Sequence, residues 1–244
     1  MKLSSKTALT SALIASLPIV VQAAEDVPFD FGADVTLASD LVSRGMSFTD
    51  EGYALQGTFD VEHESGVYVM SWASNVKLLE GDTVKPEDRA NMLLVLYAGY
   101  RGDLGEVSYD VNINRALFPG ASQDMNYDMT EFHIDFSYTL QGIDLGLAYD
   151  YSPDFFFKTG NAHNYQVSVG HTFPNDFDIT GIVGRQTVSD NAGVGFDDYT
   201  HYSLSLSYPV ADFDVSINYS NTDLDNADAL NADSRVYFTL SKTL

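Results

Sequence analysis

The stretch FHIDFSYTLQGIDLGLAYDY at residues 132–151 decides the fold class. Every second residue from Phe132 to Leu140 is apolar, and polar residues stand between them. The same alternation resumes after Gln141 and Gly142. Because successive side chains of a β-strand point to opposite faces, this stretch predicts two strands joined by a tight hairpin, each with one apolar and one polar face.

The period of two continues along the chain from Phe29. It predicts about twelve strands, most of them with the ~9–11 residues that a tilted strand needs to cross a bilayer. The segments near 66–76 and 91–101 are apolar on both faces, so their registers stay open. The expected strands lie near 29–40, 54–63, 66–76, 91–101, 105–116, 129–140, 143–151, 163–173, 177–187, 199–208, 213–220 and 234–244.

The connections between these segments alternate strictly between short and long. The short ones carry the Gly, Asn, Asp and Pro residues that tight hairpins require. An up-and-down transmembrane barrel has short periplasmic turns at one end and long extracellular loops at the other. The sequence therefore predicts an all-β chain in which residues 24–244 form a closed antiparallel up-and-down transmembrane β-barrel. A soluble β-sandwich also alternates, but it has no reason to sort its loops by length. The long connections are 41–53, 77–90, 117–128, 152–162, 188–198 and 221–233.

Residues 1–23 are typical of a secretory signal peptide. Lys2 and Lys6 precede a short apolar run, and Val21-Gln22-Ala23 supplies small residues for cleavage. We expect the chain to be exported and, after signal cleavage, to reside in the outer membrane of a Gram-negative cell. Its expected partners are then outer-membrane lipid, lipopolysaccharide and the barrel-assembly machinery.

Composition excludes several classes of function. The 244 residues include 12 Lys and Arg against 35 Asp and Glu, a formal net charge of −23, and no Cys. Such a chain has no basic surface for nucleic acid, and it can form neither a disulfide nor a thiolate site. The five His are not paired at metal-ligand spacing, and no Gly-x-Ser-x-Gly motif occurs. We expect no enzyme activity, no cofactor and no metal.

If the apolar faces meet lipid, the polar faces line a lumen rich in carboxylates. Confined carboxylates attract cations and repel anions, so the pattern suggests a cation-preferring pore. The alternative, that these acids only wet the interior, stays open. The lumen-lining candidates are Asp34, Asp60, Glu62, Glu106, Asp110, Glu131, Asp135, Asp144, Asp150, Asp178 and Asp214.

The loops supply further candidates. Arg44, Asp50 and Glu51 in the first long loop could form an ion pair that shapes the pore mouth, or a folded turn that only positions the loop. Trp72 could be an interfacial anchor. The clustered acids of loop 221–233 are compatible with Ca²⁺ binding, but their spacing departs from that of an EF-hand. A solvated acidic loop is therefore the preferred interpretation. Divalent cations that bridge this loop to lipopolysaccharide stay open as an alternative.

The first third of the chain also resembles a known family. Ser39–Ser47, Thr49–Gly52, Ala54–Gly57, His63–Tyr68 and Trp72–Val76, in this order, are similar to the opening of the TorF-like porins of proteobacteria, the Gcw_chp family. The ending Ser241–Leu244 is similar too, although Leu244 stands where the family would have an aromatic residue. The resemblance implies an outer-membrane barrel presumed to be a porin, without an established substrate or catalytic residues.

Pattern and resemblance together predict passive diffusion of small hydrophilic solutes or ions through a water-filled lumen. The lumen could be narrow, or plugged by an inward-folded loop. The main alternative is a structural or adhesive outer-membrane barrel with a closed lumen and partner-binding loops. Substrate, pore radius and oligomeric state stay open.

Overall fold

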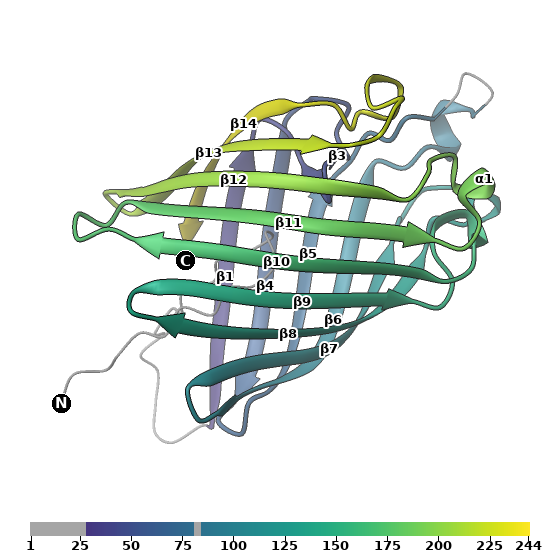
Figure 1. Cartoon of the computed structure of the whole chain (residues 1–244). Coiled ribbons are helices and arrows are strands. Elements are labelled where there is room, and N and C mark those ends of the chain that lie inside the picture. The colour runs from purple at the N-terminus through teal and green to yellow at the C-terminus, as the bar shows by residue number, and fades with distance from the viewer. Residues whose placement is uncertain (1–27, 81–83) are drawn as a thin grey trace.

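The chain forms one closed antiparallel barrel of 12 strands (Figure 1). The structure is a computed structural model that describes residues 28–80 and 84–244. The expected signal peptide at 1–23 lies outside the described residues. Each strand pairs with its neighbours in sequence, and β1 closes the ring between β4 and β14. The strands are β1 (Phe29–Ala38), β4 (Ala54–His63), β5 (Val67–Asn75), β6 (Met92–Leu104), β7 (Val107–Leu117), β8 (Met129–Leu140), β9 (Ile143–Ser152), β10 (Ala162–Thr172), β11 (Asp178–Val188), β12 (Tyr199–Val210), β13 (Phe213–Thr222) and β14 (Arg235–Thr243).

The predicted fold class is therefore confirmed, and the strands begin and end within a few residues of their expected positions. All short turns lie at one end of the barrel and all long loops at the other (Figure 1). These are called the short-turn end and the long-loop end below. None of the helices among the described residues is long and apolar enough to cross a membrane.

The two ambiguous segments acquire a definite register. Trp72 of β5 pairs with Val95 of β6, and both side chains are buried inside the barrel. Tyr68 is also inward and buried, whereas its neighbours Val67 and Val69 are exposed on the outer face. Trp72 is only 3% exposed, so the expectation that it anchors the protein at a membrane interface is wrong.

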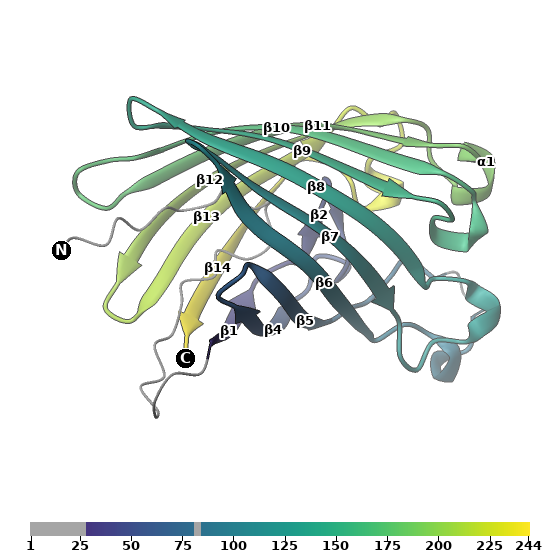
Figure 2. The same cartoon turned by 90° about the horizontal axis from the view of Figure 1, so that it is seen from below.

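Short elements in the loops were not expected from the strand rhythm. The first long loop contains a hairpin of two-residue strands, β2 (Val42–Ser43) and β3 (Met46–Ser47), which lies within the ring of strands (Figure 2). The fifth long loop carries a single helical turn, α1 (Asn191–Val194), and other loops contain 3₁₀ turns.

The side chains inside the barrel change from apolar to polar along the barrel axis, from the long-loop end to the short-turn end. At the long-loop end, the loops and the adjoining strand ends bury an apolar cluster. Further down, the inward side chains of the strands are polar or charged. The cluster includes Ala38, Leu41, Ala54, Trp72, Val76, Ala90, Leu93, Val95, Ala116, Phe118 and Tyr127.

Candidate functional site in the barrel interior

The hairpin of the first long loop crosses the interior. Its turn residues Arg44 and Gly45 have φ values of 48° and 85°, the left-handed pair that a tight two-residue hairpin requires. A Cβ on Gly45 would lie 2.3 Å from a side-chain carbon of Thr222 on β13. Glycine is therefore needed both for the backbone conformation and for the close approach of the hairpin tip to the wall.

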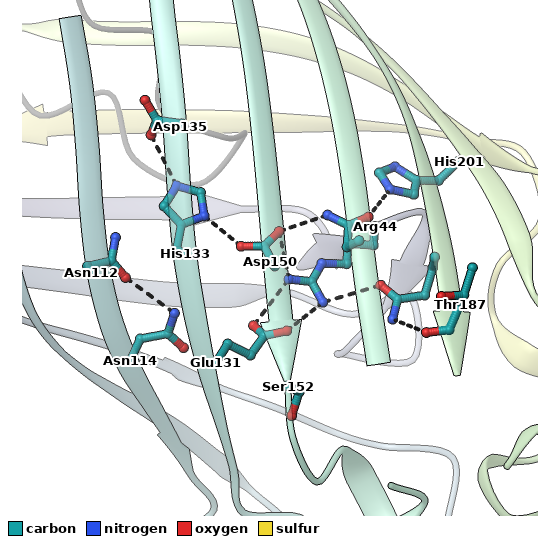
Figure 3. A network of polar contacts seen from close by, with 12 residues as sticks. Arg44, Asn112, Asn114, Glu131, His133, Asp135, Asp150, Ser152, Thr187 and His201 are labelled. Carbon is teal, nitrogen blue, oxygen red and sulfur yellow. Dashed lines mark hydrogen bonds and ion pairs between the residues drawn. The ribbon is translucent and has the colours of Figure 1, made fainter. Parts of the chain in front are cut away.

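Arg44 ties this hairpin to the far side of the barrel (Figure 3). Its guanidinium donates to both carboxylate oxygens of Glu131 on β8, at 2.9 and 3.1 Å. It also lies 3.2 Å from Oδ2 of Asp150 on β9 and donates to Gln186 on β11 at 3.4 Å. In the ring order β9 lies as far from β1, the strand before the loop, as any strand can. Bidentate charge-assisted pairs fix geometry as well as adding energy, so Arg44 holds the hairpin across the lumen.

The same carboxylates continue into a buried network (Figure 3). Nδ1 of His133 lies 2.6 Å from Asp150 Oδ1, and its Nε2 lies 3.0 Å from Asp135 Oδ2. Asn164 donates to the other oxygen of Asp150 and meets His201 at 2.9 Å. Ionised carboxylates only accept hydrogen bonds, so the two contacts of His133 suit a doubly protonated, cationic ring. The network then contains two cations, Arg44 and His133, and three carboxylates, those of Glu131, Asp135 and Asp150.

The base of the loop is fixed separately. Asp40 accepts hydrogen bonds from Ser47 and Thr49 and lies 3.0 Å from Nη1 of Arg235, whose side chain is 7% exposed. Asp50 accepts from Lys77 and from Asn231. These two hydrogen bonds, the one from Lys77 first, hold the pKa of Asp50 below its usual value.

Two loop candidates therefore lie elsewhere than expected. Arg44 is inside the barrel and does not line its mouth, because the hairpin folds inward. Glu51 is exposed and lies 3.9 Å from Arg235, so it forms no pair with Arg44.

The strands bring most of the predicted lumen carboxylates inward. Asp34, Asp110, Glu131, Asp135 and Asp150 are buried. Glu106 is the exception, since β6 extends to Leu104 and Glu106 falls in the exposed turn before β7. The partly buried candidates are Asp60, Glu62, Asp144 and Asp178, and Asp214 is exposed at the short-turn end.

Arg101 is a lumen cation that the strand pattern did not single out. It pairs with Asp110 and with Glu62, each at 2.9 Å, and its guanidinium lies 4.0 Å from the ring centre of Tyr68. Tyr68 in turn donates to Asp110 at 2.9 Å. The register that pairs Arg101 with Asp110 would have indicated this contact, but it could not be read from a segment that is apolar on both faces.

The unpaired acidic side chains gather near the short-turn end. Five of the predicted lumen carboxylates face inward and form no ion pair with any described residue: Asp34, Asp60, Asp144, Asp178 and Asp214. Asp144 and Asp178 accept hydrogen bonds from Thr139 and Thr172. This end of the lumen therefore has the largest uncompensated negative charge.

Two of the four carboxylates of the acidic loop 221–233 contact residues of the adjoining strands. Asp223 accepts from the backbone N–H of Thr200 at 2.5 Å, and Asp233 lies 2.6 Å from Nη2 of Arg235. Within 28–80 and 84–244, no group of three or more His, Asp or Glu side chains is arranged to hold a metal ion.

The family model described as "Bacterial protein of unknown function (Gcw_chp)" matches residues 22–244. The chain belongs to the Gcw_chp family. No curated protein sequence matches it.

Solved structures share its barrel. One titled "KdgM porin" is similar with a TM-score of 0.57 and 9% identity, over 87% of this chain and 97% of the other. A second, from a study of in-meso crystallisation of membrane proteins, has a TM-score of 0.50 and 8% identity, over 87% and 83% of the two chains. At such low identity these similarities establish the fold, which is that of outer-membrane porin barrels.

Proposed function

We propose that this member of the Gcw_chp family is a TorF-like outer-membrane porin. It lets small hydrophilic solutes and ions diffuse passively, with a preference for cations. Its short-turn end faces the periplasm, its long loops face outward, and the loop hairpin limits the open cross-section. The fold class and the polar inward faces of the strands support a channel.

One observation carries the cation preference: five of the predicted lumen carboxylates face inward near the short-turn end and have no ion-pair partner among the described residues. Other lumen carboxylates are neutralised by Arg44, Arg101 and His133. Selection by charge therefore belongs to the periplasmic entrance, where uncompensated carboxylates concentrate cations and repel anions.

A second candidate function is a closed barrel with a structural or adhesive role. The apolar cluster at the long-loop end and the hairpin held by Arg44 favour it, since both fill the interior. Conductance separates the two candidates. A folded, inserted barrel without conductance in any variant would leave only the closed barrel.

The test is a planar-bilayer recording of the purified mature protein under a salt gradient. Single-channel steps with a cation-selective reversal potential are expected. The variant Asp60→Asn with Asp214→Asn should move the reversal potential towards zero. The control Asp225→Asn removes a charge from the exposed sixth long loop and should leave it unchanged. An anion-selective wild type would contradict the proposed preference.

A further inference from the structure

A cavity of about 410 Å³ lies inside the barrel, between the loop hairpin and the strands. Its volume falls within the ~300–1,000 Å³ typical of small-molecule sites. Many of its lining residues are apolar or aromatic, among them Leu41, Trp72 and Phe156. This lining differs from the acidic surface of the short-turn end, so the cavity offers a separate chemistry within the same lumen.

Four tyrosines of the cavity lining have no hydrogen bond to any described residue, and one of them, Tyr202, is 40% exposed on the outer face; the other three come from three strands and point inward. These three are Tyr97 on β6, Tyr199 on β12 and Tyr237 on β14. Tyr199 is only 2% exposed. Two other tyrosines of the lining do have partners, since Tyr68 donates to Asp110 and Tyr127 to Glu80. Tyr97 and Tyr237 are only partly buried, and none of the three hydroxyls is a fully buried atom without a partner, so all three are open to the cavity and can donate to or accept from a bound molecule.

The charged groups of the cavity are already engaged. Arg44 also lines it, but its guanidinium contacts Glu131, Asp150 and Gln186. An anionic ligand would find no free cation there. A cationic ligand would compete with Arg44 for carboxylates that are already paired. Burying an unpaired charge is far more costly than burying a neutral group that forms a hydrogen bond.

We propose that this cavity binds a small uncharged molecule with an apolar body of aromatic size and a hydroxyl or carbonyl group. The apolar lining takes the body, and the hydroxyl of Tyr199 hydrogen-bonds to the oxygen, while Tyr97 and Tyr237 offer further hydroxyls from other parts of the lining. The proposal goes beyond the proposed function, because it gives the lumen a binding site for a less polar molecule than the hydrophilic solutes proposed to diffuse through it. Only the role in transport rests on that function, since binding is measured without conduction.

Trp72 provides the readout. It is the only tryptophan of the 244 residues and it lines the cavity. The detergent-solubilised protein is titrated with 4-nitrobenzyl alcohol, a neutral aromatic alcohol that quenches tryptophan fluorescence. Saturable quenching is expected. The anion 4-nitrobenzoate should bind at least about tenfold more weakly, because its charge has no free partner in the cavity.

Hydroxyl-deletion variants test the tyrosines directly. Tyr97→Phe, Tyr199→Phe and Tyr237→Phe together should weaken binding of the alcohol about tenfold, and Tyr199→Phe alone should weaken it severalfold. Neither change should affect 4-nitrotoluene, which lacks the hydroxyl. Tyr219→Phe on the outer face is the matched control, and its affinity for the alcohol should equal that of the wild type.

Three results would overturn the proposal: quenching that does not saturate, tighter binding of the benzoate than of the alcohol, or an alcohol affinity that Tyr199→Phe leaves unchanged. Circular dichroism establishes that each variant is folded. A conducting protein that binds no alcohol would refute this inference alone, and a non-conducting protein that binds it would refute only the proposed channel.

Discussion

Replacing Arg44 by Met should release the loop hairpin from the far wall. The side chain of Arg44 is 18% exposed, and those of its partners Glu131 and Asp150 are 10% and 8% exposed. Removing Arg44 leaves Glu131 without an ion-pair partner, whereas Asp150 keeps His133, and breaking a buried pair in this way costs about 3–5 kcal/mol. Methionine keeps most of the length and packing of the arginine stem, so the change isolates the loss of the guanidinium.

The magnitude for Arg44→Met lies at the low end of that range. Once the hairpin detaches, water can reach both carboxylates and recover part of their hydration. About 3 kcal/mol corresponds to a change on the order of 100-fold in the ratio of attached to detached hairpin. In a planar bilayer we therefore expect a larger single-channel conductance or a higher open probability. Limited proteolysis should also cut the first long loop faster.

The matched control is Arg115→Met. Arg115 lies 3.8 Å from Asp128, and these two side chains are 48% and 46% exposed. Exposed pairs contribute about 0–1 kcal/mol, so this variant should conduct and resist proteolysis like the wild type. The reasoning would be refuted if Arg44→Met changed neither conductance nor proteolysis, or if Arg115→Met changed both equally.

Three further predictions concern the entrance and the loop. In reversal-potential measurements, Asp60→Asn should reduce cation selectivity more than Asp110→Asn, since Asp110 is already paired with a cation. Gly45→Ala should cost about 1–3 kcal/mol, because its φ of 85° is strained for alanine, and denaturant unfolding of the refolded barrel measures this cost. Hydrogen bonds from Lys77 and Asn231 lower the pKa of Asp50 below its unfolded value of 3.8. The stability they contribute is therefore fully present above pH 3.8 and is lost as the pH falls through the lower pKa of the folded state. Lys77→Met should reduce this loss, so the melting temperature of the variant should depend less on pH in the acid range.

The barrel wall could be predicted from sequence because its information is local. Each strand carries its own alternation, and each short turn carries its own Gly, Asn or Asp, so the strand number and the sorting of loops follow without any long-range contact. The register of β5 and β6 could not be predicted, because these segments are apolar on both faces and show no alternation. Tyr68 and Trp72 are inward in β5, but Val67 and Val69 are equally apolar, and only the pairing with β6 distinguishes the faces.

The candidate site could be predicted only in part, because its contacts are distant in sequence. Arg44 and Glu131 are 87 residues apart, and Arg44 and Gln186 are 142 apart. The period-two pattern of the strands carries no information about contacts between residues so far apart in sequence. The turn of the hairpin did have a local signal, since Arg44-Gly45 between Ser43 and Met46 suits a two-residue turn. That signal predicts a hairpin but not that it folds inward.

The inward fold has a physical cause that connects the two halves of the lumen. Inside this barrel, one loop finds both an apolar cluster for its apolar residues and carboxylates for its arginine. Leu41 packs in the apolar cluster at the long-loop end, and Arg44 reaches carboxylates further in that would otherwise repel one another. The free energy that holds the hairpin therefore comes from two sources, burial of apolar surface and neutralisation of Glu131 and Asp150. Because Arg44→Met removes only the second, the apolar anchor should keep the base of the loop in place while the tip moves, so the barrel should remain folded as its conductance rises.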